Sequence, residues 1–238
     1  MSKGRIVFMG TPEFAVASLE ALIATGIEVA AVVTAPDKPA GRGRQLRMSA
    51  VKEAAVNHGL RILQPERLRD PVFLDELDAI SAELFVVVAF RMLPEAVWRK
   101  PALGTINLHA SLLPAYRGAA PINWAIIDGE SRTGATTFFI QEKIDTGDIL
   151  DAVELDIGPE ENAGGLHDRL MHAGAYLLVG TVLRVLRGDR SSVPQPAIAD
   201  GLPVAPKLTP EACRIDWNGR ARKVHDFLTV GAAAPLQE

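Results

Sequence analysis

The chain has 238 residues, of which 48% are apolar and 5% aromatic, so it suits one α/β domain with an aliphatic core and at most a short appendage. The formal net charge of −4 offers no overall positive surface to nucleic acid, so no DNA partner is expected and any RNA contact has to come from a local patch. The single cysteine, Cys213, excludes a disulfide framework, and the longest apolar run, residues 84–90, is far too short to cross a membrane. These properties predict a soluble, cytoplasmic protein with no membrane partner.

The N-terminal segment predicts two parallel strands joined by a helix. Residues 5–9 are a short apolar run that ends at Gly10, and residues 27–33 form a second run rich in β-branched side chains. Between them, Thr11 is placed to cap a helix whose first position is taken by Pro12. The spaced glycines of a dinucleotide-binding fingerprint are absent, so this turn is interpreted as a tight strand-to-helix connection.

The segment from Ala35 to Met48 combines positive charge with residues that prevent regular structure. Its breakers are Pro36, Pro39, Gly41 and Gly43, and its cations are Lys38, Arg42, Arg44 and Arg47. A run of charges is often only a solvated surface. A flexible cationic loop on an otherwise acidic chain can also follow a phosphate backbone and become ordered on it. Composition alone leaves both interpretations open.

The middle of the chain continues the alternation of helix and strand. Its patterns predict helices over residues 51–57 and 71–77, a short strand over 61–63 and a central strand over 84–90. Residues 91–94 then leave the central strand as a loop at its carboxyl end. In an open α/β sheet, loops in this position line the ligand crevice.

The stretch from Thr105 to Ile127 carries the strongest indication of a site. Alternation over residues 105–109 predicts a strand that places Asn107 and His109 on one face. After it come the turn Ser111-Leu112-Leu113-Pro114, the pair Arg117-Gly118, and Pro121 in the first turn of a helix over residues 121–127. Polar side chains at the carboxyl end of a strand, followed by a loop and a helix start, indicate a ligand crevice. A histidine on a strand can also be a purely structural hydrogen-bonding group, and spacing alone does not decide between the two roles.

The remaining residues complete the α/β pattern. Strands are predicted over 135–140 and 149–155, a long helix through 166–186, and a linker rich in proline and alanine over 191–210. Asp145-Thr146-Gly147 has the letters of an aspartic-protease site, but such proteases pair two aspartates across an all-β fold. This chain alternates helix and strand and has no second copy of the motif, so the protease interpretation is set aside.

Several motifs together resemble the methionyl-tRNA formyltransferases, which belong to the 10-formyltetrahydrofolate-dependent formyltransferase family. The resemblance is carried by Met9-Gly10-Thr11-Pro12-Glu13-Phe14, by Pro36-Asp37-Lys38-Pro39-Ala40-Gly41-Arg42-Gly43, by Asn107-Leu108-His109-Ala110-Ser111-Leu112-Leu113-Pro114, by Arg117-Gly118-Ala119-Ala120-Pro121-Ile122, and by Ile144-Asp145-Thr146-Gly147-Asp148-Ile149. The Ser-Leu-Leu-Pro turn is shared with other folate-dependent formyltransferases. The basic loop joined to the first motif is more specific to the tRNA enzymes.

The resemblance implies a fold and an activity. The fold is Rossmann-like, an open and mostly parallel twisted sheet with helices on both faces, over residues 1–190. The activity is transfer of a formyl group from the co-substrate 10-formyltetrahydrofolate to the α-amino group of methionyl-tRNA, which gives the initiator of translation. No metal is expected, because no ligand cluster is evident in the sequence.

The resemblance also implies the site residues. Asn107, His109 and Asp145 would be catalytic, with Asn107 donating to an oxyanion and Asp145 orienting His109. The folate would lie along Phe90, Arg91, Met92, Leu93, Ser111, Leu112, Leu113 and Pro114, and the tRNA would contact Lys38, Arg42, Arg44 and Arg47.

The resemblance weakens at the C-terminal end. Members of the family normally continue past a stretch like Arg214-Ile215-Asp216-Trp217 into a β-barrel that helps to hold tRNA, and here the match fades after Phe227. Residues 191–210 are therefore expected to be a linker, and residues 211–238 the truncated start of that second domain. Three other interpretations remain: a related transferase acting on glycinamide ribonucleotide or an amino-sugar nucleotide, a hydrolase that releases formate, and a non-catalytic form that binds tRNA or folate.

Overall fold

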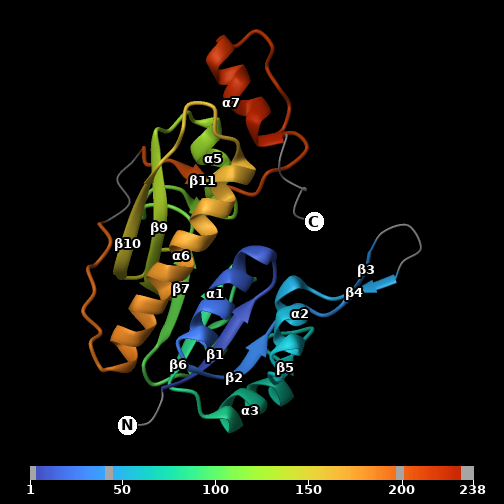
Figure 1. The fold of residues 1–238 in the computed structure, drawn as a ribbon, viewed down its shortest axis with the longest axis vertical. Helices are drawn as coiled ribbons and strands as arrows, with labels where there is room; N and C mark the ends of the chain where they lie inside the picture. Colours follow the sequence, from blue (N-terminus) through green and yellow to red (C-terminus); the bar gives the residue numbers. More distant parts are fainter. Residues whose placement is uncertain (1–3, 41–44, 197–200, 232–238) are drawn as a thin grey trace.

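One mixed β-sheet forms the centre of the molecule. The computed structural model describes residues 4–40, 45–196 and 201–231. Its strands are β1 (Arg5–Gly10), β2 (Glu28–Val33), β3 (Lys38–Ala40), β4 (Gln45–Arg47), β5 (Ile62–Leu63), β6 (Leu84–Val88), β7 (Thr105–His109), β8 (Arg117–Gly118), β9 (Arg132–Phe139), β10 (Ile149–Asp156) and β11 (Val204–Ala205). Seven of these pair in the order β10-β9-β7-β6-β1-β2-β5 (Figure 1). Strand β9 is antiparallel to both of its neighbours, and the other pairs in this sheet are parallel.

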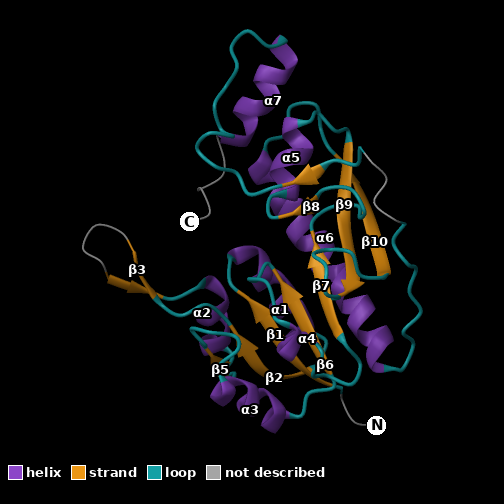
Figure 2. Cartoon of the chain, turned by 180° about the vertical axis from the view of Figure 1, so that it is seen from behind, coloured by secondary structure: helices purple, strands orange, loops and turns teal. Residues whose placement is uncertain are grey.

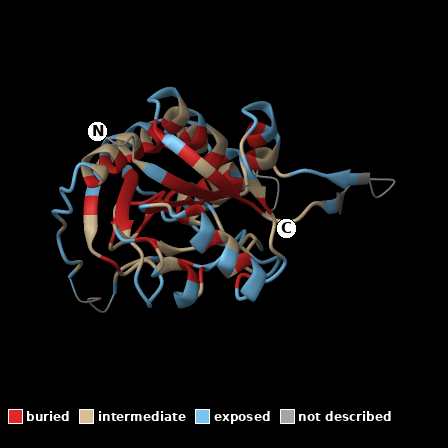
Figure 3. Ribbon diagram, turned by 90° about the horizontal axis from the view of Figure 1, so that it is seen from below, coloured by how far each residue is buried: buried red, intermediate tan, exposed pale blue. Residues whose placement is uncertain are grey.

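Helices cover both faces of this sheet, as predicted (Figure 2). They are α1 (Glu13–Ala24), α2 (Ala50–Asn57), α3 (Pro71–Ile80), α4 (Glu95–Trp98), α5 (Pro121–Ile127), α6 (Ala163–Leu186) and α7 (Ala221–Gly231). Alternate residues of β1 enter two separate hydrophobic clusters, because successive side chains of a strand point to opposite faces. Ile6 and Phe8 pack with α1, α2 and α6, whereas Val7 and Met9 pack with α3 and α4. The buried strands accordingly lie between more exposed outer layers (Figure 3).

Two of the predicted element boundaries that differ from the structure have a local cause. Helix α1 begins at Glu13 with Pro12 at its N-cap, so Thr11 does not cap it and Pro12 precedes its first turn. Strand β6 ends at Val88, two residues before the predicted end of the strand. The reason is Ala89, whose φ of 45° lies in the left-handed region that a strand cannot continue through. This bend turns the chain out of the sheet at the start of a predicted folate loop.

The basic segment was expected to lack regular structure, and this prediction was wrong for its two arms. Strands β3 and β4 form an antiparallel hairpin in which Lys38 lies opposite Arg47, and the hairpin projects from the body of the molecule (Figure 1). Proline is tolerated because each strand of a two-stranded ribbon has a free edge where no N–H is needed. At the base of the hairpin, the carboxylate of Asp37 accepts hydrogen bonds from Lys52 (2.5 Å) and Gln64 (2.9 Å). Arg42 and Arg44 lie outside the described residues.

The segment that follows α6 packs back across the loop after β7. The Tyr116 N–H donates to the Pro203 carbonyl (2.7 Å), and the Ala120 N–H donates to the Ala205 carbonyl (3.1 Å). Strand β11 pairs in parallel with β8, and α7 then packs against α5. The predicted linker is therefore hydrogen-bonded, at Pro203 and Ala205, to the loop that follows β7.

Helix α6 is the one helix of the described chain that is long and apolar enough to cross a membrane by length and composition. Its buried side chains include Leu166, Leu170, Leu178 and Val182, which is the stripe that the sequence predicts. The helix packs against α1, β9 and β10, and these side chains belong to the larger hydrophobic cluster. It is therefore a core helix of this domain.

Candidate active site

Asn107 and His109 of β7 lie on one face of the sheet, as predicted. In the parallel register, Asn107 lies beside Val87, which in turn lies beside Met9. Val87 and Met9 belong to the cluster under α3 and α4, so Asn107 points to that side. Ile106 and Leu108 point to the opposite side and are buried in the larger cluster. His109, two residues after Asn107, is on the same face as Asn107 because the side-chain period of a strand is two.

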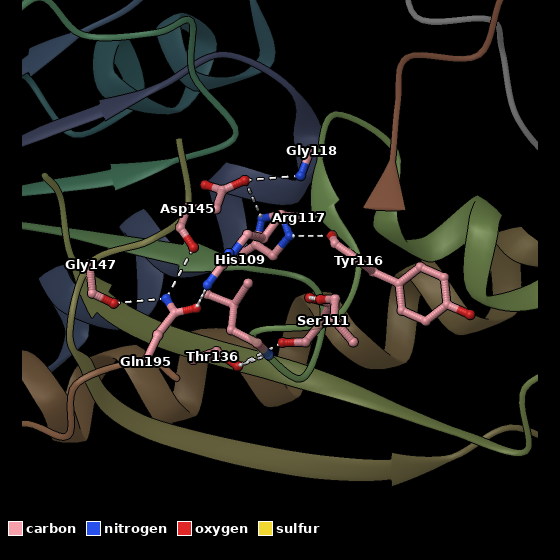
Figure 4. Close-up of polar contacts among 11 residues, drawn as sticks. His109, Ser111, Tyr116, Arg117, Gly118, Thr136, Asp145, Gly147 and Gln195 are labelled. Carbon is pink, nitrogen blue, oxygen red and sulfur yellow. Dashed lines mark hydrogen bonds and ion pairs between the residues drawn. The ribbon is translucent and has the colours of Figure 1, made fainter. Parts of the chain in front are cut away.

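His109 is held between a carbonyl and a carboxylate. Its Nε2 lies 2.8 Å from the carbonyl oxygen of Tyr116, and since a carbonyl only accepts, Nε2 carries the proton. The other ring nitrogen, Nδ1, lies 3.8 Å from Oδ2 of Asp145 (Figure 4). Both side chains are largely buried, with 8% and 13% of their surfaces exposed. At this distance the two atoms are neighbours without a direct hydrogen bond.

Asp145 reaches His109 from a loop that folds back over the sheet. The loop leaves β9 next to the start of β7, where the Ile140 N–H donates to the Thr105 carbonyl (2.8 Å). Gly147 returns to the end of β9, and the Asp145 side chain extends toward the carboxyl end of β7 from the turn just before it. The Gly118 N–H donates to Oδ2 of Asp145 (3.0 Å). The carboxylate is thus fixed by a backbone donor from the loop after β7.

Two glycines allow the close approach of backbone segments around Asp145. A Cβ on Gly147 would lie 1.6 Å from the carbonyl oxygen of Phe139, so no other residue fits where the loop meets the end of β9. Gly118 has a φ of +127°, and a Cβ there would lie 2.4 Å from the carbonyl oxygen of Ala205. Both glycines belong to motifs that carry the sequence resemblance, and the structure gives their physical role.

The side-chain amide of Asn107 makes no hydrogen bond to the part of the chain that the structure describes. The residue is half-buried, and it is absent from the buried polar groups that lack a partner. Its amide therefore remains open to hydrogen-bond a ligand on the face that carries His109. A free donor next to a histidine–carboxylate pair is an arrangement that can stabilise an oxyanion and move a proton.

The two predicted folate loops leave neighbouring strands. Residues 90–93 follow β6 and residues 111–114 follow β7, and these strands pair in parallel up to Val88 and Leu108. Met92 is 72% exposed and Leu93 is buried, so the first loop offers one accessible apolar side chain. The guanidinium of Arg91 donates to the carbonyls of Pro65 and Glu66. Partial burial lowers the pKa of Arg91 from its ordinary value.

Part of the second folate loop is already hydrogen-bonded inside the chain. The Leu113 N–H donates to Oγ1 of Thr136 (3.1 Å), and that hydroxyl donates to the Ser111 carbonyl (2.7 Å). The Ser111 hydroxyl in turn donates to the Ala115 carbonyl (2.7 Å). These hydrogen bonds fix the shape of the turn. Because they occupy the Ser111 carbonyl and the Leu113 N–H, fewer backbone groups of this loop remain to bind folate than the sequence suggested.

Two surface hollows lie beside the first folate loop. One, of about 410 Å³, is lined by Arg67, Leu68, Arg69, Arg91, Met92, Leu93 and Pro94. The other, of about 550 Å³, is lined by Arg69, Pro94, Glu95, Ala96, Arg99 and Lys100. Neither hollow is lined by Asn107, His109 or Asp145. The candidate catalytic site is therefore defined by the positions of these three side chains. The smaller hollow shares three residues with the predicted folate loop.

Three residues around the site have no role in the sequence prediction. Tyr116 supplies the carbonyl that fixes His109, and Thr136 fixes the turn after β7. Gln195 hydrogen-bonds to Arg117 and to the loop that carries Asp145. Tyr116 lies inside the stretch that the sequence indicates as a site, but no local pattern points to Gln195.

Comparison with known proteins gives consistent similarities. The sequence model of the formyl transferase family matches residues 4–182. A methionyl-tRNA formyltransferase of Bacteroides fragilis is 52% identical over 226 residues, which cover 94% of this chain and 70% of that protein. An N-formyltransferase from Helicobacter canadensis, solved with folinic acid and dTDP-3-aminofucose, has a TM-score of 0.70 at 20% identity and covers 96% of this chain and 80% of its own. Glycinamide ribonucleotide transformylase 1 from Symbiobacterium toebii has a TM-score of 0.67 at 17% identity and covers 82% of this chain and 96% of its own. The last two similarities show the fold alone.

Proposed function

Because the chain belongs to the methionyl-tRNA formyltransferases of the formyl transferase family, we propose that it transfers a formyl group from 10-formyltetrahydrofolate to the α-amino group of methionyl-tRNA. The product is N-formylmethionyl-tRNA, the initiator of translation, and the reaction would take place in the cytoplasm. The observation that carries the mechanism is a free amide on Asn107 beside the buried pair of His109 and Asp145. The scheme requires no metal.

Asn107 is assigned to the oxyanion. Attack of the neutral α-amine on the formyl carbon forms a new C–N bond and moves negative charge onto the formyl oxygen. The side-chain NH2 of Asn107 is free to donate to that oxygen, and one preorganised donor of this kind contributes about 3–4 kcal/mol to transition-state stabilisation. Asn107 is half-buried on a strand, which holds its side chain in place. A substrate oxygen can bind its NH2 without breaking a hydrogen bond to the described part of the protein.

His109 and Asp145 are assigned to proton transfer. The attacking amine has to lose a proton, and N10 of the folate has to gain one as its bond to the formyl carbon breaks. Because Nε2 is committed to the Tyr116 carbonyl, Nδ1 is the ring nitrogen that can take up and return such a proton, with Oδ2 of Asp145 3.8 Å away to orient it or an ordered water. Asp145 also orients the imidazole, in the manner of the third member of a catalytic triad.

The two substrates are assigned to the elements on either side of this pair. The folate would lie along residues 90–93 and 111–114, with the exposed side chain of Met92 as an apolar wall. The acceptor tRNA would contact Lys38 and Arg47 on the projecting hairpin, together with Arg42 and Arg44. We propose residues 1–190 as the catalytic domain, residues 191–210 as the connection and residues 211–238 as the start of a C-terminal domain.

An acceptor assay tests this proposal. Purified protein is incubated with 10-formyltetrahydrofolate labelled in the formyl group and with methionyl-tRNA, with glycinamide ribonucleotide, with an amino-sugar nucleotide, or with no acceptor. Label on methionyl-tRNA alone is expected, and His109→Ala serves as the inactive control. Label on a small amine would support the related transferases, and formate without acceptor would support a hydrolase. Folate binding with no transfer in any arm would indicate a non-catalytic form.

A further inference from the structure

Gln195 joins two parts of the candidate site that are far apart in sequence. It lies in the segment between α6 and β11, where the sequence indicates only a linker. Its Nε2 donates to the carbonyl of Asp145 (3.0 Å) and to the carbonyl of Gly147 (2.7 Å). Its Oε1 accepts from a terminal nitrogen of Arg117 (2.5 Å), as drawn in Figure 4. One side chain thus holds the loop before β10 and the loop after β7.

The three hydrogen bonds fix the orientation of the Gln195 amide. The NH2 group has two protons, and each meets a carbonyl oxygen, which can only accept. If the amide were rotated by 180°, its oxygen would face the carbonyl oxygens of Asp145 and Gly147, and its NH2 would face the guanidinium of Arg117. None of these contacts could be a hydrogen bond. The charged donor on Oε1 also polarises the amide, which strengthens the two bonds that Nε2 donates. Gln195 is therefore specified at this position by the chemistry of its neighbours.

The backbone that Gln195 holds is in an uncommon conformation. Asp145 has a φ of 52°, a left-handed value that few residues other than glycine adopt, and such a residue needs support from its surroundings. Gln195 bonds to the carbonyl of Asp145 itself and to that of Gly147, two residues later. The carboxylate of Asp145 accepts from the Gly118 N–H, and Gly118 follows Arg117. The contacts close a ring from Gln195 through Asp145 and Gly118 to Arg117 and back.

From this ring we infer that Gln195 is a positioning residue for formyl transfer, which sets the distance between the Asp145 carboxylate and Nδ1 of His109. The inference rests on the proposed function for its kinetic consequence. Its structural claim, that Gln195 holds the Asp145 carboxylate on the Gly118 amide, stands independently of any activity. The hydrogen bonds of Gln195 within the described residues go to Arg117, Asp145 and Gly147. Arg117 follows Tyr116, whose carbonyl accepts from His109, so a second route to the ring exists, and the positioning role assigned to Gln195 is the route through Asp145.

Two variants separate the hydrogen bonds that the Gln195 side chain makes from the space that it fills. Gln195→Met keeps the length of the side chain and removes every hydrogen bond. Gln195→Glu keeps an acceptor for Arg117 but turns a carboxylate toward the two carbonyls. Val193→Ala is the matched control, since Val193 is two residues earlier, its side chain is 66% exposed, and its backbone bridge to Ile149 does not involve the side chain. Thermal unfolding of each variant establishes that it is folded.

Hydrogen exchange at the Gly118 amide measures the position of the carboxylate without any substrate. In protein labelled with 15N-glycine, this amide should exchange at least about tenfold faster in Gln195→Met and in Gln195→Glu than in the parent. Val193→Ala should leave the exchange rate unchanged. If Gly118 exchanges at the parental rate in both Gln195 variants, Gln195 does not hold Asp145 and the inference is overturned.

A double-mutant cycle measures the same connection through activity. With methionyl-tRNA as acceptor, Gln195→Met should lower kcat by about tenfold to a hundredfold with little change in the KM for folate. In an Asp145→Ala background the same change should lower kcat by less than about twofold, because the residue through which it acts is gone. Reductions that multiply in the double variant would show an independent structural effect and overturn the positioning role. If the parent transfers no formyl group while Gly118 exchange responds to Gln195, the proposed function fails and the structural role of Gln195 stands.

Discussion

The Asp145 carboxylate lies 3.8 Å from Nδ1 of His109, although the loop that carries Asp145 leaves its strand beside the opposite end of β7. The pair is therefore built by a loop that folds back over the sheet, and it is held by the Gly118 amide on one side and by the Tyr116 carbonyl on the other. The two side chains are therefore positioned together. Their contributions to the reaction should consequently be inseparable.

His109 and Asp145 are expected to act as one unit in formyl transfer. His109→Ala and Asp145→Ala should each lower kcat strongly, and the double variant should be scarcely slower than the more severe single one, because residues that act together are non-additive. The measurement is kcat for all three variants at saturating folate and methionyl-tRNA. Multiplicative reductions would show that the two side chains act in separate steps.

Asn107 is expected to contribute to kcat and not to folate affinity. Asn107→Ala should lower kcat by about a hundredfold or more, because it removes a preorganised oxyanion donor. Asn107→Asp, which has nearly the same size, should be at least as slow because it sets an acceptor against the developing negative charge. Folate affinity, measured by fluorescence titration, should change little in both variants. A raised KM for folate with an unchanged kcat would instead identify Asn107 as a binding group.

The projecting hairpin is expected to bind the phosphate backbone of tRNA. Lys38→Ala combined with Arg47→Ala should weaken tRNA binding and lower the slope of log affinity against log salt by about 0.7–0.9 for each phosphate that the protein no longer neutralises. Both side chains are exposed and lie opposite each other on β3 and β4, so the double change should not affect the core. Affinity for folate should be unchanged.

The matched control for the hairpin removes the same charge elsewhere. Arg5→Ala combined with Arg132→Ala deletes two exposed cations that pair with Glu28 and Glu154 on the main sheet. This variant should keep the parental salt slope. Equal slopes for the hairpin variant, the control and the parent would mean that the hairpin is only a solvated surface.

Tyr116 is expected to make the stability of the fold fall at high pH. Burial, and then a hydrogen bond to Glu130, raise the pKa of Tyr116 above its ordinary value near 10. Because the pKa of Tyr116 is higher in the folded state than in the unfolded state, the neutral phenol contributes its full stabilisation below pH 10. This stabilisation is lost as the pH rises above that value. In this range the free energy of unfolding should decline by up to about 1.4 kcal/mol per pH unit from this group.

Replacing each tyrosine by phenylalanine shows how much of the loss of stability at high pH comes from Tyr116. Tyr116→Phe should be less stable than the parent at pH 8, by about 0.5–1.5 kcal/mol, because the exposed carboxylates of Asp128 and Glu130 lose the hydroxyl donor that they share. Between pH 10 and 12 its free energy of unfolding should fall less steeply than that of the parent, so the difference narrows. Tyr176→Phe is the control, since Tyr176 is 85% exposed. Parallel declines for Tyr116→Phe and the parent in urea titrations would contradict this assignment.

The sequence could predict the sheet and the polar face of β7 because both depend on local periodicity. The alternation over residues 105–109 places Asn107 and His109 together whatever the rest of the chain does. The parallel pairing of the strands follows from the same alternation of helix and strand. The predicted end of β6 is two residues too late because no local pattern signals the left-handed conformation of Ala89.

Other parts of the site depend on long-range contacts that periodicity does not encode. Asp145 is indicated by resemblance alone, since its approach to His109 depends on a loop that leaves β9 beside the other end of β7. The bonds of Gln195 cross 78, 50 and 48 residues of sequence. The hairpin is not predicted because proline and glycine usually break regular structure, although a two-stranded ribbon tolerates both.

The return of residues 203–206 across the loop after β7 sets an order for biosynthesis. A nascent chain that has emerged only to residue 190 already contains Asn107, His109 and Asp145, but it lacks Gln195 and the strand that pairs with β8. The loop between Tyr116 and Ala120 can then find neither of its backbone acceptors, the carbonyls of Pro203 and Ala205. The sheet can therefore form on the ribosome before the site does, and the geometry around Asp145 is completed only after residue 206 has left the exit tunnel.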